Sequence, residues 1–191
     1  RHAFDPTKRS LEWRRTLGID DNEIVVSFVG RIVMEKGLDR FVAALEELKR
    51  AGVEHRALVV GDGPAKAWLE QRLPDAVFTG YLDGAALACA YASADVFLNP
   101  STTETFGNVT AEAMASGLPA VCADATGSRS LVVDGKTGFL VPADDTASYA
   151  AALARLITNG ETRARMGDAA RERSKFYDWD TVLRTVLQHY L

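Results

Sequence analysis

The fold is decided by one stretch of the chain, IVVSFVGRIVMEKGLDRFVAALEEL at residues 24–48. Its first six residues form a nearly continuous apolar run that ends at Gly30, which is typical of a strand buried on both faces of a parallel sheet. Apolar residues then recur every three or four positions, at Leu38, Phe41, Val42, Leu45 and Leu48. This spacing predicts an amphipathic helix that lies on the sheet.

The same alternation of strand and helix patterns continues to residue 141. Further strands are predicted from short apolar runs at 57–60, 76–79, 95–98, 119–122 and 139–141. Helical patterns separate most of them, at 64–73, 85–92 and 108–116, and the tail after residue 145 reads as three more helices, one Ala-rich, one charged at 161–175 and one at 180–190. We therefore predict an α/β fold, a doubly wound, Rossmann-like parallel sheet with a helical C-terminal tail.

Composition restricts the partners. The 191 residues carry a formal net charge of −4, so we expect no nucleic-acid partner, because gripping a phosphate backbone takes a clustered basic surface. Basic residues at 163–175 alternate with acidic ones, which favours a solvated helix face over a lipid-binding patch. We find no apolar run of membrane-spanning length and no signal peptide, and expect a cytoplasmic location, with peripheral contact at the cytoplasmic membrane face left open.

Two cations lie in the loop GRIVMEKG, directly after the first strand. Arg31 and Lys36 could neutralise a diphosphate, the first as a bidentate fork and the second as a point charge. Two ordinary solvated side chains are the alternative. Gly30 and Gly37 favour a ligand, since glycines let a backbone approach closely. The GDGP turn that starts at Gly61 is a weak signal by itself.

The strongest motif is PSTTETFGNVTAEAMASGLP at residues 100–119. A polar loop carrying Glu104 follows a strand and leads through Gly107 into a short helix, whose free N–H groups would form an anion site. That helix is apolar or small on almost every side, so we expect it to be buried all round. Its lone carboxylate, Glu112, should then have a definite hydrogen-bond partner.

The spacing of Glu104 and Glu112, with Phe106 and Gly107 between them, resembles the signature of the retaining glycosyltransferases of family four, group one. The loop GRIVMEKG is similar to that family's phosphate-binding loop, VVGDGP and FTGYLDG to its next strand ends, and DGKTGFLVPADD to its closing segment. The resemblance implies the C-terminal, donor-binding half of a two-domain GT-B enzyme. Such a domain binds a nucleoside diphosphate sugar, UDP- or GDP-hexose, and supports hexosyl transfer to an acceptor hydroxyl held by the enzyme's own N-terminal domain.

The resemblance also implies a role for each matching residue. Arg31, Lys36 and Glu104 would be catalytic, the cations on the diphosphate and Glu104 on the donor sugar. Glu112 would bind the ribose hydroxyls. The donor-binding set is Gly30, Arg31, Lys36, Gly61, Tyr81, Leu82, Glu104, Phe106, Gly107, Asn108, Val109 and Glu112. No metal or other cofactor is expected, because cations already face the leaving group.

One departure from the family pattern concerns the loop ATGSRS, where Ser130 stands in place of an acidic residue and leaves the donor sugar open. Residues 1–23 are expected to hold the end of an interdomain linker and a first helix, 24–175 the nucleotide-sugar-binding domain and 176–191 a C-terminal helix. Because the chain opens on Arg1 without periodicity, we expect further sequence before it. A sugar-nucleotide epimerase of the same plan and a non-catalytic regulatory domain are the alternatives.

Overall fold

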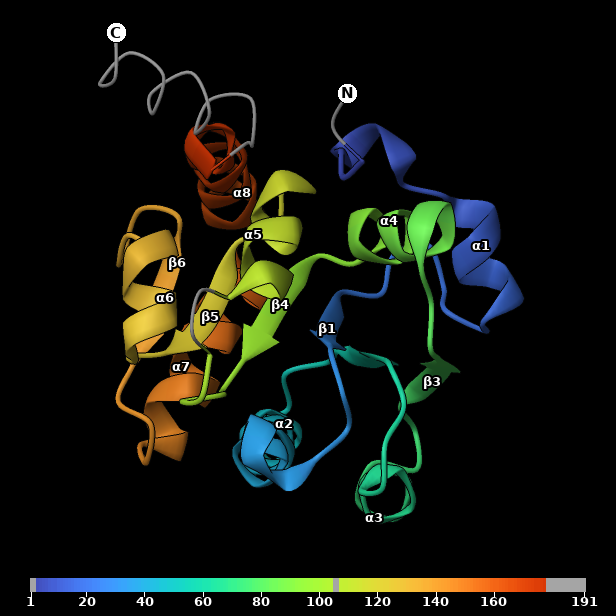
Figure 1. The fold of residues 1–191 in the computed structure, drawn as a ribbon. Coiled ribbons are helices and arrows are strands. Elements are labelled where there is room, and N and C mark those ends of the chain that lie inside the picture. Colours follow the sequence, from blue (N-terminus) through green and yellow to red (C-terminus); the bar gives the residue numbers. More distant parts are fainter. Residues whose placement is uncertain (1–2, 105–106, 178–191) are drawn as a thin grey trace, which may run out of the picture.

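The computed structural model describes residues 3–104 and 107–177. Six parallel strands form one sheet in the order β3-β2-β1-β4-β5-β6 (Figure 1). The strands are β1 (Val25–Val29), β2 (Arg56–Val60), β3 (Val77–Gly80), β4 (Val96–Asn99), β5 (Ala120–Ala123) and β6 (Gly138–Val141). All six strand predictions are confirmed, with ends shifted by one residue or less, and so is the doubly wound fold.

Helices cover both faces of this sheet (Figure 1). One face carries α2 (Leu38–Arg50), α3 (Lys66–Arg72) and α7 (Thr146–Thr158), and the other α4 (Gly84–Ser93), α5 (Asn108–Ala115) and α6 (Thr126–Leu131). The remaining helices are α1 (Leu11–Thr16), α8 (Gly160–Ser174), which packs on α5, and the short turns η1 (Pro6–Lys8), η2 (Met34–Lys36) and η3 (Lys175–Tyr177). The sheet is therefore the middle of three layers.

Successive side chains of β1 point to opposite faces of the sheet and so enter two separate hydrophobic cores. Val26 and Phe28 pack with α2 and α7, whereas Val25 and Val29 pack with α4 and α5. All four side chains are buried. Each buried apolar side chain of this size contributes roughly 1.5–3 kcal/mol, so β1 is fixed from both sides and the loop after it starts from a rigid point.

The N-terminal segment is tied to the sheet through a buried arginine. Arg14 of α1 is fully buried and donates to the Asp95 carboxylate (3.2 Å) and to the backbone carbonyl groups of Asp20 (2.8 Å) and Glu23 (2.5 Å). Asp95 also accepts from the backbone N–H of Val25 (2.8 Å). The buried charge is thus paired, as burial requires, and α1 is locked to the starts of β1 and β4.

Two expectations about the C-terminal third are corrected. The segment from Thr126 to Leu131 is a helix, α6, which the sequence pattern did not indicate. Basic residues of α8 are not simply solvated: Arg163 donates to the Leu156 carbonyl at the end of α7 (2.7 Å), and Arg171 pairs with Asp5 (2.5 Å). The helix predicted at 180–190 lies outside the described residues.

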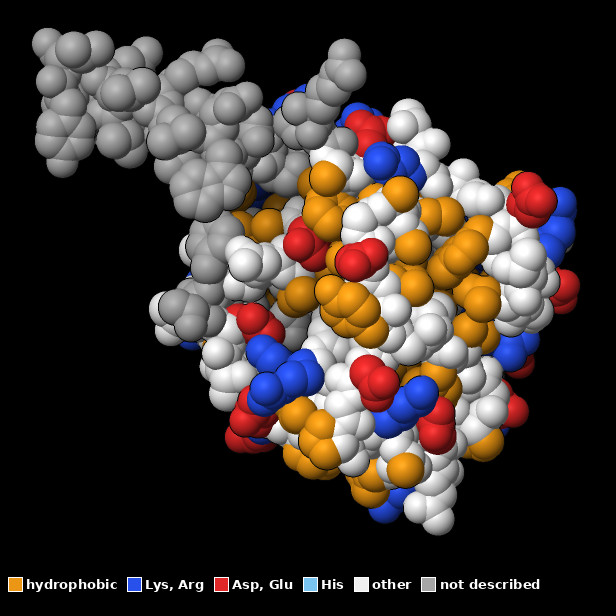
Figure 2. All heavy atoms as spheres, turned by 45° about the vertical axis from the view of Figure 1, so that its right-hand side comes forward, with side chains coloured by type: hydrophobic (Ala, Val, Ile, Leu, Met, Phe, Trp, Pro, Cys, Tyr) orange, Lys and Arg blue, Asp and Glu red, His pale blue; other side chains and the backbone are white. Residues whose placement is uncertain are grey.

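No helix within the described ranges is both long and apolar enough to cross a bilayer. Figure 2 shows the molecule from the side where α1, α4 and β3 lie in Figure 1. Apolar side chains gather there between separate acidic and basic ones, and the view shows no continuous basic surface.

Candidate functional site

The direction in which successive strands are added to the sheet reverses between β1 and β4. From β1 the chain moves outward to β2 and β3, and it then returns to the other side of β1 to form β4, β5 and β6. In such sheets ligands bind beyond the carboxyl ends of the strands, next to the reversal. A cavity of about 490 Å³ opens at this point, lined by Phe28, Val29, Gly30, Arg31, Lys36, Asn99, Thr103, Glu104, Gly107, Asn108 and Val109.

Glycines bring the loops around the cavity into direct contact. A Cβ on Gly61 would lie 1.9 Å from the carbonyl oxygen of Gly30, and one on Gly37 would lie 2.6 Å from that of Pro100. Gly37 has a φ of 72°, in the left-handed region that glycine adopts readily. The loops after β1, β2 and β4 therefore pack backbone against backbone, and the contact of Gly37 with Pro100 sets the end of η2 beside the loop that carries Glu104.

Lys36 and Glu104 form an ion pair inside the cavity. Their Nζ and Oε1 atoms are 2.8 Å apart, and the side chains are only 24% and 16% exposed. The sequence predicted both as site residues but not their pairing. A lysine has three donor hydrogens, so Lys36 can keep Glu104 oriented and still donate to a bound anion.

Arg31 differs from Lys36 in both exposure and partner. Its guanidinium group pairs with Glu35 (3.1 Å), four residues further along the chain, and the two side chains are 68% and 59% exposed. Such exposed pairs contribute little to stability. Arg31 can therefore exchange Glu35 for a ligand at small cost.

The N-terminus of α5 opens into the same cavity. Its N-cap residue, Gly107, has a φ of 86° and no side chain that could cap the helix. Gly107, Asn108 and Val109 all line the cavity. Uncapped N–H groups and the helix dipole favour an anion at such an end, so the cavity combines a helix N-terminus with two cationic side chains.

Glu112 lies one turn further along α5 and is not among the residues that line the cavity. Its carboxylate accepts a hydrogen bond from the Tyr91 hydroxyl group at 3.0 Å, which confirms the expected partner. Burial raises the pKa of Glu112, and the bond from Tyr91 opposes this rise. The expectation that α5 is buried all round was wrong, because Asn108 is exposed and Val109 and Glu112 are half-buried; this side of the helix borders the site.

The other predicted donor residues lie to one side of the cavity. Gly61 and Tyr81 follow the carboxyl ends of β2 and β3, and neither they nor Leu82 are among the lining residues. Gly61 donates its N–H to the Gly80 carbonyl (2.8 Å), and Tyr81 is 74% exposed. Gly61 adjoins the cavity through its backbone contact with Gly30, which lines it. Phe106 lies outside the described residues.

Two polar residues of the cavity escaped the sequence prediction, Asn99 and Thr103. The Asn99 amide donates to the Thr110 hydroxyl group (3.2 Å) and accepts from the Ser101 N–H (3.3 Å), which joins the end of β4 to α5. A polar residue at a predicted strand end was the available signal for Asn99. Thr103 is exposed and offered none beyond its place beside Glu104.

Ser130 does not line the cavity. Its hydroxyl group donates to the Gly127 carbonyl within α6 (2.8 Å). Gly127 itself touches the site, because a Cβ there would lie 2.3 Å from the Glu104 carbonyl oxygen. The start of α6 therefore supports the backbone of Glu104, while Ser130 itself bonds within α6.

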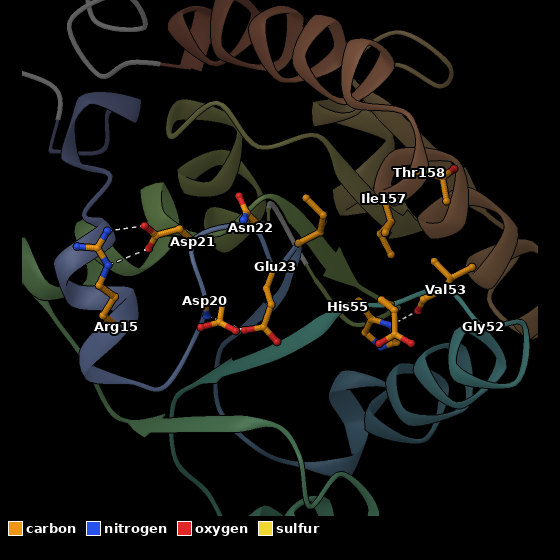
Figure 3. A pocket seen from close by; sticks show the side chains of 12 residues that line it. Arg15, Asp20, Asp21, Asn22, Glu23, Gly52, Val53, His55, Ile157 and Thr158 are labelled. Carbon is orange, nitrogen blue, oxygen red and sulfur yellow. Dashed lines mark hydrogen bonds and ion pairs between the residues drawn. The ribbon is translucent and has the colours of Figure 1, made fainter.

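A wider hollow of about 850 Å³ lies at the opposite edge of the sheet, before β1 and β2 begin. In Figure 3, Arg15 points to Asp21, and the His55 ring points to the Val53 carbonyl (2.8 Å). The lining includes four carboxylates, on Asp20, Asp21, Glu23 and Glu54, against one arginine. An excess of negative charge repels a diphosphate, so this hollow does not suit the predicted ligand.

The fold is that of an α/β domain, and the cavity at its switch point combines cationic side chains with a helix N-terminus. The family model described as "Glycosyl transferases group 1" matches residues 10–173. The chain therefore belongs to the group 1 glycosyl transferases, as its motifs indicated.

Curated relatives and solved structures agree with this assignment. The GDP-mannose-dependent alpha-mannosyltransferase of Mycolicibacterium smegmatis is 42% identical over 191 residues, which cover 98% of this chain and 48% of that protein. This chain thus spans about half the length of that relative.

Among solved structures, Anabaena HepE in complex with UDP and glucose superposes with a TM-score of 0.83 at 25% identity, over 98% of this chain and 55% of that one. The C-terminal domain of a group 1 glycosyl transferase, LpcC from Francisella tularensis, gives a TM-score of 0.74 at 23% identity and covers 90% of this chain and 96% of that one. The chain thus has the fold of the C-terminal half of a GT-B enzyme.

Proposed function

We propose that this chain is the donor-binding domain of a retaining hexosyltransferase. It would bind a nucleoside diphosphate hexose and act with an N-terminal domain that holds the acceptor hydroxyl. The observation that carries the proposal is the Lys36–Glu104 pair at the N-terminus of α5, inside a cavity at the switch point. The HepE complex, whose fold this chain shares, supports a UDP-linked sugar as one candidate, and the mannosyltransferase relative supports a GDP-linked one.

The proposed reaction breaks the bond between the sugar C1 atom and the diphosphate. The leaving oxygen takes the electron pair, and the N–H groups of α5, Lys36 and Arg31 stabilise its charge. Glu104 holds the sugar hydroxyl groups, Glu112 holds the ribose, and the backbone near Tyr81 and Leu82 borders the base. The acceptor oxygen then bonds to C1 on the face that the diphosphate left, its proton passes to the departing phosphate oxygen, and the configuration is retained.

Titration calorimetry of this chain with UDP, GDP and ADP tests the binding half of the proposal. We expect one of them to bind clearly more tightly than its uncharged nucleoside. The chain alone should transfer no sugar, because it lacks the half that positions the acceptor. Robust transfer by the isolated chain, or no binding of any of the three nucleotides, would contradict the proposal.

A second test uses the full-length protein with UDP-glucose or GDP-mannose. Transfer should require an added acceptor and should survive EDTA, because Lys36, Arg31 and the helix N-terminus already neutralise the leaving group. A new sugar nucleotide formed without acceptor would instead indicate an epimerase. Loss of activity with EDTA and its return with magnesium would overturn the metal-free account.

A further inference from the structure

Tyr91 is held in one position by its surroundings. It lies on α4, is fully buried, and donates its hydroxyl hydrogen to Oε2 of Glu112 at 3.0 Å. Two aromatic rings fix its own ring: Phe4 meets it edge-on at 5.5 Å, and Phe97 of β4 lies at 6.1 Å. A donor that cannot move fixes the carboxylate that accepts from it.

The hydrogen bond from Tyr91 occupies only one of the two carboxylate oxygens of Glu112. Oε2 accepts from Tyr91, and no other hydrogen bond or ion pair of the Glu112 carboxylate is found within the described residues. Oε1 is therefore free to accept from a ligand. Glu112 is half-buried and lies one helical turn beyond Asn108, which lines the cavity. A nucleotide that extends from the cavity along this side of α5 would reach the free oxygen.

The electrostatics of the pair agree with this geometry. Burial raises the pKa of Glu112, which weakens it as an ionised acceptor, and the Tyr91 bond acts in the opposite direction. Burial also raises the pKa of Tyr91 well above 10, so its hydroxyl group keeps its hydrogen at neutral pH. Tyr91 thus remains a donor while Glu112 is ionised.

We propose that Tyr91 is a positioning residue for nucleotide recognition, which holds Oε2 of Glu112 so that Oε1 accepts from a ribose hydroxyl group. The inference rests on the proposed function, which places Glu112 on the ribose. Tyr91 itself touches no ligand. Its effect passes through Glu112 alone.

The chain offers a matched control in Tyr149 of α7. Tyr149 is also fully buried, but its hydroxyl group has no hydrogen-bond partner among the described residues. Tyr149→Phe and Tyr91→Phe therefore remove the same atom from two buried rings, and only the second removes a bond to Glu112.

The experiment measures Kd for the tightest of UDP, GDP and ADP and for its 2′,3′-dideoxy form. The ribose ratio is the Kd of the dideoxy form divided by that of the parent. We expect a ratio well above one in the unchanged chain, about fivefold lower in Tyr91→Phe, and unchanged in Tyr149→Phe. Glu112→Gln should lower the ratio at least as far, and adding Tyr91→Phe to it should lower it no further.

The outcomes separate the two proposals. If Glu112→Gln lowers the ratio but Tyr91→Phe leaves it unchanged, or weakens both ligands equally, the positioning role is wrong and the proposed function stands. If the unchanged chain binds no nucleotide, shows a ratio of one, or keeps its ratio in Glu112→Gln, the role of Glu112 fails, and the inference about Tyr91 fails with it.

Discussion

The two edges of the sheet carry opposite kinds of hollow. The carboxyl edge has the smaller one, about 490 Å³, which holds the half-buried Lys36–Glu104 pair and an uncapped helix N-terminus. The amino edge has the larger one, about 850 Å³, where acidic groups predominate and Arg15 already pairs with Asp21. Both edges belong to the same sheet, so the difference lies in the loops and helix ends that flank each edge.

This difference shows that cavity volume alone does not indicate which of the two hollows suits a phosphate. Parallel strands direct their helices so that helix N-termini gather at the carboxyl edge, and the positive ends of the helix dipoles gather with them. Cations added there reinforce a field that already favours anions. The amino edge lacks that field, and its carboxylates would oppose a phosphate.

The largest expected effect is on turnover, from Glu104→Gln in the full-length enzyme. We expect the rate to fall about 100-fold or more, because the variant removes the carboxylate that we propose faces the sugar. Affinity for the bare nucleoside diphosphate should not fall, since Lys36 loses a competing partner. Steady-state kinetics and calorimetry check both parts. Glu54→Gln, an exposed change at the amino edge, is the control and should alter neither.

Normal turnover in Glu104→Gln would show that its pairing with Lys36 serves the fold and not the reaction. Equal losses of turnover in Glu104→Gln and Glu54→Gln would erase the contrast between the two edges.

The second-largest expected effect is a loss of diphosphate affinity, and it differs between Lys36 and Arg31. Lys36→Ala should weaken binding by about 1.5–3 kcal/mol, because a charge-assisted bond is lost at a largely buried position. Arg31→Ala should cost about 1 kcal/mol or less, since its guanidinium is 68% exposed and shared with Glu35. Calorimetry at low and high salt measures this, with the uncharged nucleoside as control. A larger loss in Arg31→Ala would reverse the assignment.

Much of this fold was predictable because its signals are local. The apolar run at Val25–Val29 and the spacing from Leu38 to Leu48 each decide their element without help from the rest of the chain. The helix α6 was missed for the opposite reason. Its sequence TGSRSL has little helical preference, and its supports are tertiary: Arg129 pairs with Asp124, and Arg173 of α8 donates to the Ser130 carbonyl (2.9 Å) at its other end.

The residues of the candidate site were also predictable only where their signals are local. Motif spacing named Lys36 and Glu104, but their ion pair spans 68 positions and depends on the contact between Gly37 and Pro100, which no local pattern encodes. Tyr91 had no signal at all, because a tyrosine in an Ala-rich helix reads as a core residue. Only the packing of α4 beside α5 shows its hydroxyl group on Glu112.

A smaller effect is expected from Glu112→Gln, with opposite signs on stability and binding. Folding raises the pKa of Glu112 above its ordinary value of 4.5. Such a carboxyl group adds stability only at a pH below its ordinary pKa, and this stability is lost as the pH rises through the folded-state pKa. At pH 7.5 the ionised Glu112 therefore costs stability. Urea unfolding should find the variant more stable than the unchanged chain at pH 7.5 and equal to it near pH 4, while nucleotide affinity falls by about 1–2 kcal/mol. A variant less stable at pH 7.5 would mean that Glu112 serves the fold.

The smallest effect is expected at the amino edge, from Asp21→Asn. The hydrogen bond from Arg15 lowers the pKa of Asp21. A carboxyl group whose pKa is lowered on folding adds stability at a pH above its ordinary pKa. This stability is lost as the pH falls through the folded-state pKa. The variant should therefore be slightly less stable at pH 7, and the difference should vanish in acid, as urea unfolding at both pH values can measure. Nucleotide affinity should stay unchanged, because the pair lies across the sheet from the cavity. If Asp21→Asn weakened nucleotide binding as much as Lys36→Ala, the ligand would occupy the larger hollow, and the assignment of the two edges would have to be exchanged.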